Sequence, residues 1–368
     1  MNFYVPVKVV TGKGCVCQSA DSLKKLGKRC LIATGKNAAK RSGALDDVIC
    51  ALDSRSIGYT VFDGIEQNPS YASCLAAAMM AKADGADFII GIGGGSPLDA
   101  AKAIAVLAAC TDTSEEAFYA MRWDGAPLPV VAIGTTAGTG SEVTPVAVIT
   151  TTGGLKKSVR SDAIYPRMAL GDASYMTSLS PEFTRSTALD ALSHCLESYF
   201  NRTANEMSRA MAARGISILA GMLEKTVHAD TAPLTLEDRE ELYAASLYGG
   251  YAISVTGTAF PHAMGYFLSE QYGIPHGNAC AIYLEEFISH NAAVAPKEAE
   301  ALFLATGTDQ AMLTDLIRRN LPDISITLTA EEVARLSPRF ESNKSLMKSY
   351  GTVDRDFATR LLTKLLVK

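Results

Sequence analysis

Three of the five histidines in the chain occur in settings that suit metal binding; the five stand at positions 194, 228, 262, 276 and 290. Asp190 and His194 fall in an apolar stretch that is predicted to be helical, and an offset of four places both side chains on one face. His262, in Phe-Pro-His-Ala-Met-Gly, and His276, in Tyr-Gly-Ile-Pro-His-Gly, lie among glycines and prolines in apolar sequence. Because buried polar groups need a partner, a divalent cation is one that would satisfy this set.

Taken singly, each of these histidines is better explained as a structural residue, but the set of four side chains favours a metal site. One carboxylate with three imidazoles suits Fe(II) or Zn(II) and leaves room for a substrate oxygen, and Mn(II) or Co(II) would also be accepted. His228 and His290 have no such neighbours and are interpreted as structural.

Two loops in the first half of the chain are predicted to bind a dinucleotide. Gly93, Gly94, Gly95 and Ser96 follow the predicted strand 87–92 and open a helix, where close-approaching backbone and free N–H groups can hold a phosphate. The run has neither the G-x-G-x-x-G pattern nor the G-K-[ST] ending of a P-loop. The second loop follows the predicted strand 129–133; alone it could be a capped helix start, but paired with the first it supports a nucleotide across neighbouring strand ends. Its hydroxyl side chains include Thr135, Thr136 and Thr139.

The motifs divide between two predicted domains. Apolar runs at 29–34, 87–92 and 129–133 predict strands buried on both faces of a parallel sheet, with helices such as 73–82 between them. From about residue 180 strand-like runs become scarce, and Ser180-Pro181-Glu182 is typical of a helix start. Further helices are predicted at 205–223 and 236–248. We therefore expect an α/β dinucleotide-binding domain, residues 1–179, and an all-helical metal-binding and catalytic domain, residues 180–368.

Composition narrows the function further. The 368 residues carry a net charge of -5, which offers no basic footprint for nucleic acid, and no apolar run is long enough to span a membrane. The N-terminus lacks the basic and apolar regions of a signal peptide, and the eight cysteines include no C-x-x-C pair. These features predict a soluble cytoplasmic protein with reduced thiols.

The motifs together resemble the iron-containing (group III) alcohol dehydrogenase family. The similar pieces are Gly-Gly-Gly-Ser-Pro-Leu-Asp at 93–99, Thr-Thr-Ala-Gly-Thr-Gly-Ser-Glu-Val-Thr at 135–144, Asp-Ala-Leu-Ser-His at 190–194, and the two histidine motifs between 261 and 277. The resemblance runs to about residue 291 and thins over the remainder. It implies a Rossmann-like α/β domain and an all-α domain in a dehydroquinate synthase-like architecture, and it implies a homo-oligomer.

The resemblance also implies roles for individual residues. The metal ligands would be Asp190, His194, His262 and His276, and the pyrophosphate would lie on Gly94, Gly95 and Ser96. Other residues that would face an NAD(H) or NADP(H) cofactor are Asn68, Asp99, Thr135, Thr139 and Lys157. Two positions depart from the family pattern. Gly35 stands where many NAD-preferring members carry Asp, and with Lys36 or Lys40 nearby this favours NADP(H) or dual use. Tyr266 replaces a histidine that is often assigned to proton relay, so Tyr266 is either the catalytic residue that relays the proton or a residue that shapes the pocket.

The expected reaction is hydride transfer between the cofactor and a small primary alcohol or aldehyde, with the metal as Lewis acid. Side chains expected around the metal suggest a mostly apolar pocket: Met264, Tyr266, Phe267 and Tyr272. Three alternatives stay open at this point: a zinc glycerol-dehydrogenase-type polyol oxidoreductase, a lyase of the same fold, and a non-catalytic nucleotide or metal sensor.

Overall fold

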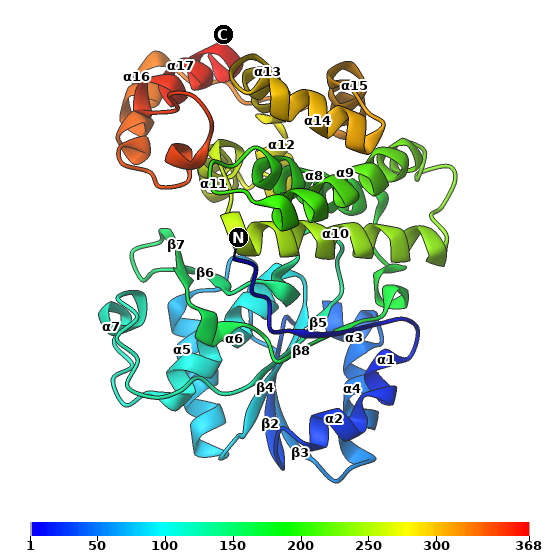
Figure 1. Cartoon of the computed structure of the whole chain (residues 1–368). Helices are drawn as coiled ribbons and strands as arrows, with labels where there is room; N and C mark the ends of the chain where they lie inside the picture. Colours follow the sequence, from blue (N-terminus) through cyan, green and yellow to red (C-terminus); the bar gives the residue numbers. More distant parts are fainter. Residues whose placement is uncertain (1, 368) are drawn as a thin grey trace. The chain divides into compact units, whose positions relative to one another are not determined.

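A computed structural model describes residues 2–367, which divide into two compact units (Figure 1). The first unit comprises Val5–Leu179 together with Thr235–Tyr243, and the second consists mainly of Ser180–Leu234 and the chain from Ala244 onward. Within residues 2–367, none of the helices combines the length and the apolar character that a membrane crossing requires.

The first unit is built on a parallel sheet. Its strands are β1 (Lys8–Thr11), β2 (Arg29–Thr34), β3 (Gly58–Phe62), β4 (Phe88–Gly93), β5 (Val130–Gly134) and β8 (Met168–Gly171). Their order across the sheet is β1-β8-β5-β4-β2-β3, and every pair is parallel. The central strands β4 and β5 are buried along their whole length, as the uninterrupted apolar sequence predicts. A separate antiparallel hairpin joins β6 (Val146–Thr150) to β7 (Lys156–Arg160).

Helices cover both faces of this sheet (Figure 1). One face carries α1 (Cys15–Gln18), α2 (Ala20–Lys24), α3 (Ala38–Arg41) and α4 (Ala44–Asp53); the other carries α5 (Tyr71–Ala83) and α6 (Gly95–Ala109), with α7 (Glu115–Tyr119) beside them. The buried side of α6 is rich in alanine, so the helix packs close to the sheet. A Cβ at Gly91 in β4 would lie 2.8 Å from the Cβ of Ala101, which shows how little space separates the two elements.

The strand order reverses direction between two adjacent strands of the sheet, β2 and β4. The chain leaves β2 toward α4 on one face and leaves the adjacent β4 toward α6 on the other face. Because the two connections diverge, the carboxyl ends of these strands lie at a switch point, where open α/β sheets bind ligands. Gly35 and the Gly93–Ser96 loop both begin at this edge.

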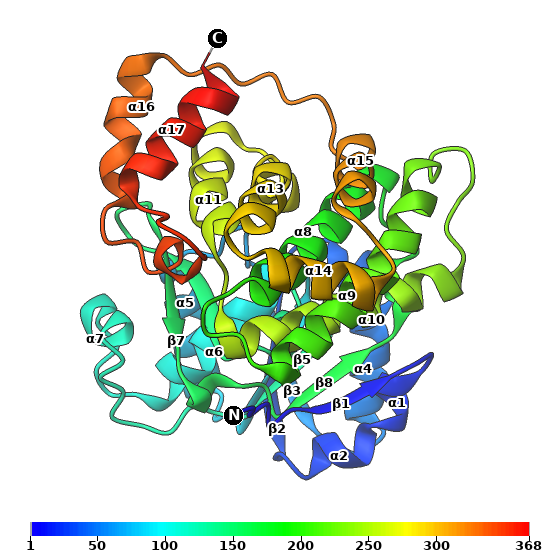
Figure 2. The same ribbon diagram turned by 45° about the horizontal axis from the view of Figure 1, so that its top comes forward.

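The second unit is helical. It contains α8 (Pro181–Tyr199), α9 (Glu206–Val227), most of α10 (Leu236–Thr256), α11 (Phe260–Tyr272), α12 (His276–Ala281), α13 (Leu284–Val294), α14 (Pro296–Thr306), α15 (Gln310–Asn320), α16 (Ala330–Leu336) and α17 (Arg355–Leu366). Figure 2 shows α16 and α17 side by side near the end of the chain. The Ser180 hydroxyl caps α8 by accepting a hydrogen bond of 3.2 Å from the backbone N–H of Phe183. The predicted α/β and all-helical fold classes are therefore confirmed.

The sequence located elements better than it located their ends. The predicted strands 29–34, 87–92 and 129–133 correspond to β2, β4 and β5 within one residue. Two helices run further than predicted: α9 continues to Val227 instead of residue 223, and α10 to Thr256 instead of residue 248. The segment after residue 248 contains glycine, valine and threonine, which are weak helix formers, so tertiary packing keeps it helical.

Candidate active site

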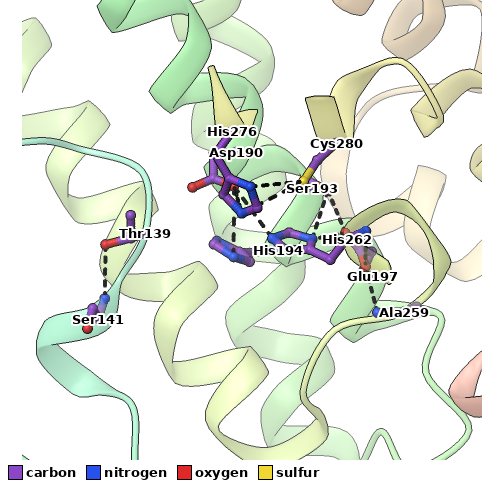
Figure 3. Close-up of polar contacts among 10 residues, drawn as sticks. All are labelled: Thr139, Ser141, Asp190, Ser193, His194, Glu197, Ala259, His262, His276 and Cys280. Atoms are coloured by element: carbon purple, nitrogen blue, oxygen red, sulfur yellow. Dashed lines mark hydrogen bonds and ion pairs between the residues drawn. The ribbon is translucent and has the colours of Figure 1, made fainter. Parts of the chain in front are cut away.

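Three helices of the second unit bring the four predicted metal ligands together (Figure 3). Asp190 and His194 lie one turn apart on α8, His262 lies in the first turn of α11, and His276 opens α12. The Oδ1 atom of Asp190 lies 4.0 Å from Nε2 of His194, 3.5 Å from Nε2 of His262 and 3.8 Å from Nε2 of His276. Three imidazole nitrogens therefore surround one carboxylate oxygen.

Close packing of α12 on α8 places the last of these histidines. A Cβ at Gly277 would lie 1.8 Å from the backbone oxygen of Ser186, so only glycine allows the start of α12 to approach α8 this closely. Pro275 directly precedes α12. Because proline has no backbone N–H, it cannot donate the hydrogen bond that a longer helix would need at this position. The Pro-His-Gly sequence thus fixes both the start of the helix and the position of His276.

The cluster has the properties of a cation site. Asp190 is 3% exposed and His262 is 2% exposed, yet Oδ1 of Asp190 and Nε2 of His262 make no hydrogen bond to any of residues 2–367. Leaving such atoms buried and unsatisfied costs about 1–3 kcal/mol each. A divalent metal ion among the four side chains would satisfy both atoms, so the residues present fit a metal.

The pKa values of Asp190 and His262 also indicate a site that favours a cation. Burial would raise the pKa of Asp190, but His194, His276 and His262 outweigh it, and the pKa lies well below its usual value. Burial would lower the pKa of His262, but Cys280, Glu197 and Asp190 raise it above its usual value. Together these groups form a buried cluster that favours positive charge, which a proton or a metal ion can supply, so metal and protons compete there.

Glu197 orients one of the histidines. Its Oε1 atom accepts a hydrogen bond of 2.5 Å from Nδ1 of His262 and one of 2.5 Å from the hydroxyl of Ser193. Its Oε2 atom accepts from the backbone N–H of Ala259 at 2.5 Å. Burial raises the pKa of Glu197, but His262 and these hydrogen bonds lower it overall, so the carboxylate is ionised. With Nδ1 engaged, Nε2 is the ring nitrogen left to face Asp190, an arrangement common among metal-binding histidines.

Two residues of the cluster, Glu197 and Cys280, were not predicted from the sequence. Glu197 stands seven residues after Asp190, and Cys280 stands four after His276, so helical spacing places each on the same face as a predicted ligand. Candidate donor atoms of four residues lie within 4.8 Å of one another: Asp190, His262, His276 and Cys280. The spacing was visible in the sequence, but which faces are buried was not.

Tyr266 lies against two of the histidines. Its ring stacks on that of His276 at a centroid distance of 5.6 Å and an angle of 11°, and meets that of His262 edge-on at 6.5 Å. The other side chains expected around the metal behave differently. Met264 and Phe267 are fully buried, and Tyr272 is 41% exposed and contacts Phe267. The stacked Tyr266 ring therefore covers one face of the His276 imidazole.

The two glycine-containing loops of the first unit lie against each other. A Cβ on Gly94 would lie 3.1 Å from Oγ1 of Thr136, and a Cβ on Gly95 would lie 2.9 Å from Cγ2 of Thr139. The backbone N–H of Thr135 also donates to the backbone oxygen of Gly93 at 2.9 Å. Glycine is therefore needed for the close approach of the loops, and the first N–H groups of α6 lie beside the hydroxyl-bearing loop, which suits an anion.

The remaining predicted cofactor residues occupy different places. The backbone N–H of Asn68 donates to the Ser96 hydroxyl at 3.1 Å, so these two residues lie together. Asp99 braces the second loop: its oxygens accept from the Ser141 hydroxyl at 2.6 Å and from the backbone N–H of Val148 at 2.9 Å. Lys157 is exposed on β7, where its ammonium group lies 4.7 Å from the ring centroid of Tyr119.

The end of β2 carries the predicted cofactor-selecting residues. Gly35 directly follows β2, and a Cβ there would lie 3.2 Å from the backbone oxygen of Ile65. Lys36 and Lys40 are both exposed, and the ammonium group of Lys40 pairs with Asp63 at 3.0 Å. Lys40 holds the pKa of Asp63 below its usual value. The structure thus adds an acidic side chain to a region for which the sequence predicted only basic ones.

The two histidines interpreted as structural lie in different surroundings. His290 contacts the backbone oxygen of Tyr350 through Nε2 at 2.8 Å, and its ring lies against Phe260 and Phe357. His228 lies on the surface with Nε2 4.0 Å from Glu224.

Comparison with known proteins links both units to one family. Residues 6–173 match the family model described as iron-containing alcohol dehydrogenase, and residues 184–323 match its C-terminal counterpart. Alcohol dehydrogenase 4 of Schizosaccharomyces pombe is 34% identical over 286 residues, 77% of this chain and 66% of that protein. The 1,3-propanediol dehydrogenase of Citrobacter freundii is 30% identical over 362 residues, 97% of this chain and 90% of that protein.

Solved structures show the same likeness. An iron-containing alcohol dehydrogenase from Thermotoga maritima superposes with a TM-score of 0.91 at 34% identity, covering 99% of this chain and 99% of that one. Sulfoacetaldehyde reductase from Bifidobacterium kashiwanohense, solved in complex with NAD+, superposes with a TM-score of 0.88 at 26% identity, covering 99% and 98%.

Proposed function

Because this chain belongs to the iron-containing alcohol dehydrogenase family, we propose that it interconverts small alcohols and aldehydes at one metal ion held by its helical unit. The proposed ligands are Asp190, His194, His262 and His276. One observation carries the assignment: three imidazole nitrogens lie 3.5–4.0 Å from Oδ1 of Asp190, a buried atom that makes no hydrogen bond among residues 2–367.

The chemistry divides between bound groups and side chains. A metal ion in the cluster supplies Lewis acidity toward the alcohol or carbonyl oxygen, and a nicotinamide dinucleotide accepts or supplies the hydride. Asp190 contributes the negative charge that attracts the cation. Glu197 holds His262 with Nε2 toward the cluster, and the low exposure of both residues keeps bulk water from that nitrogen. His276 has the most exposed side chain of the four proposed ligands, at 32%, so a substrate would enter on its side.

The proposed dinucleotide site is the carboxyl edge of the parallel sheet. The N–H groups that begin α6, at Gly95 and Ser96, would hold the pyrophosphate, with Thr136 and Thr139 facing them across the paired loops. Asn68 supports Ser96 through a backbone hydrogen bond. The NAD+ bound to the structurally similar sulfoacetaldehyde reductase supports a dinucleotide for this chain.

We propose that the enzyme uses NADP(H) at least as readily as NAD(H). Gly35 offers no carboxylate to repel a 2′-phosphate, and Lys36 is exposed beside it. Lys40 is partly neutralised by Asp63, so Lys36 is the better candidate to contact the phosphate. Steady-state measurement of kcat/KM for NADPH and NADH checks this, and a strong preference for NADH contradicts it.

The substrate class extends to diols. The 1,3-propanediol dehydrogenase that matches nearly the whole chain, and the lactaldehyde reductase of Escherichia coli at 32% identity, act by their names on small oxygenated molecules. A polyol and a simple alcohol would therefore be alternative substrates of the same proposed reaction, and they differ mainly in size and number of hydroxyl groups. These relatives are oxidoreductases, so they give no support to a lyase or to a non-catalytic sensor.

We further propose a cytoplasmic homo-oligomer. All eight cysteines are free, which suits a reducing compartment. The apolar side chains Val294, Leu304 and Met312 are exposed at 44%, 86% and 42%, and a second subunit would shield such side chains from water. Light scattering coupled to gel filtration measures the mass directly.

The proposed function is tested by NADPH oxidation with butyraldehyde and, in parallel, 1,3-propanediol oxidation with NADP+. Enzyme stripped with EDTA is compared with enzyme reconstituted anaerobically with Fe(II). We expect turnover only after reconstitution, and we expect Asp190→Asn to lose both metal binding and turnover. Binding of one metal equivalent without turnover on any aldehyde or alcohol would contradict the proposed activity.

A further inference from the structure

Cys280 lies among the proposed metal ligands although neither the family resemblance nor the sequence motifs assign it a role. It stands one turn after His276 on α12, so both side chains project from the same helix face. Its Sγ atom lies 3.9 Å from Nε2 and 4.0 Å from Nδ1 of His276. The residue is fully buried, so the thiol is shielded from bulk solvent by the surrounding side chains.

The sulfur lies close to buried polar atoms that make no hydrogen bond among residues 2–367. The candidate donor atoms of Cys280, Asp190, His262 and His276 all lie within 4.8 Å of one another. Two buried atoms of this group, Oδ1 of Asp190 and Nε2 of His262, make no hydrogen bond among residues 2–367. Ligand atoms about 2.0–2.3 Å from a shared zinc ion lie roughly 3–4 Å apart, so only small side-chain adjustments would complete such a set.

We propose that Cys280 is a further metal donor, which gives this site a thiolate ligand for borderline-soft cations such as Zn(II) and Co(II). The inference rests on the metal site of the proposed function and adds a ligand to it. On binding, the S–H bond breaks, a sulfur–metal bond forms and the proton is released to solvent, with no change of oxidation state. Sulfur favours Zn(II) and Co(II) over the harder Mn(II), so Cys280 sets metal selectivity.

Another buried cysteine of the same unit shows what a packing thiol looks like here. Cys195 follows His194 on α8, but its sulfur points toward the neighbouring helices. Added Cβ atoms at Gly215 of α9 and Gly249 of α10 would lie 2.5 Å and 3.4 Å from it. Cys195 therefore fills a space between helices, whereas Cys280 faces the polar cluster, and the two make a matched pair for substitution.

The experiment is a Co(II) titration of metal-free enzyme without cofactor, followed by absorption spectroscopy. Nitrogen and oxygen ligands give Co(II) weak visible bands, and a thiolate adds an intense sulfur-to-metal charge-transfer band in the near-ultraviolet. We expect the wild-type protein and Cys195→Ala to show both features. Cys280→Ala and the more conservative Cys280→Ser should keep the visible bands and lose the charge-transfer band, and thermal unfolding checks that each variant is folded.

A second readout is the ratio of dissociation constants for Mn(II) and Zn(II). Cys280→Ala should lower the ratio of the Mn(II) to the Zn(II) constant by about tenfold or more, equivalent to about 1.4 kcal/mol. A wild-type Co(II) spectrum with visible bands but no charge-transfer band overturns the inference and leaves the Asp/His site intact. A charge-transfer band that survives in Cys280→Ala also overturns it. Failure of the wild-type protein to bind Co(II) overturns both this inference and the proposed metal site.

Discussion

Replacing Glu197 by glutamine should weaken metal binding while leaving the helical unit folded. The carboxylate accepts hydrogen bonds from Nδ1 of His262, from the Ser193 hydroxyl and from the backbone N–H of Ala259. Glutamine has nearly the same shape, but its NH2 group cannot accept a hydrogen bond, and the negative charge is lost. At least one donor must therefore lose its partner or turn away.

The expected size follows from these contacts. A hydrogen bond to a charged group contributes about 1.5–3 kcal/mol, and substitution of residues that orient metal ligands typically lowers metal affinity about 10–100-fold. The two figures agree, since about 1.4 kcal/mol corresponds to tenfold in a dissociation constant. We expect Glu197→Gln to raise the dissociation constant for Zn(II) or Co(II) within that range.

Competition against a chromophoric chelator measures the dissociation constant directly. Glu182→Gln serves as the control, because Glu182 is a carboxylate in the first turn of the same helix, far along α8 from the cluster. Circular dichroism and thermal unfolding show whether Glu197→Gln is folded. If the folded variant binds metal as tightly as the wild-type protein, then the Glu197–His262 contact does not orient the ligand, and the reasoning fails.

Four further predictions follow from the site. Gly95→Ala should raise KM for the dinucleotide about tenfold with little change in kcat, because its Cβ would lie 2.9 Å from Thr139 and overpacking costs about 1–3 kcal/mol; a KM within about twofold of wild type contradicts the close approach. Tyr266→Phe keeps the ring stacked on His276 and should lower kcat less than about tenfold, whereas a loss of about 100-fold at unchanged metal content would assign proton transfer to the hydroxyl. Lys36→Ala should raise KM for NADPH more than KM for NADH, and equal effects would place the 2′-phosphate elsewhere. Metal removal should lower the unfolding temperature, since a ligand at about 1,000 times its dissociation constant stabilises the folded state by about 4 kcal/mol. Calorimetry with and without EDTA measures this temperature, and an unchanged value contradicts the prediction.

The sequence by itself determined the local features of this protein. Uninterrupted apolar runs in the sequence predicted the buried strands. Ser180 and Pro181 predicted the start of α8, because helix capping depends only on residues near the helix end. The family could be identified from short motifs for the same reason: a phosphate loop or an Asp-x-x-x-His pair is complete within a few residues. The ends of α9 and α10 were misjudged, since packing against other helices carries them past weak helix formers.

Only the tertiary structure decided which side chains meet. Asp190, His262 and His276 come from three helices, and the approach of α12 to α8 at Gly277 depends on contacts far apart in sequence. The same packing turns Glu197 and Cys280 into the cluster, although each was visible in the sequence only as an ordinary acid and thiol. Helical spacing tells which residues share a face, but burial of that face against another helix is a long-range property, and it is burial that converts a polar side chain into a metal-binding one.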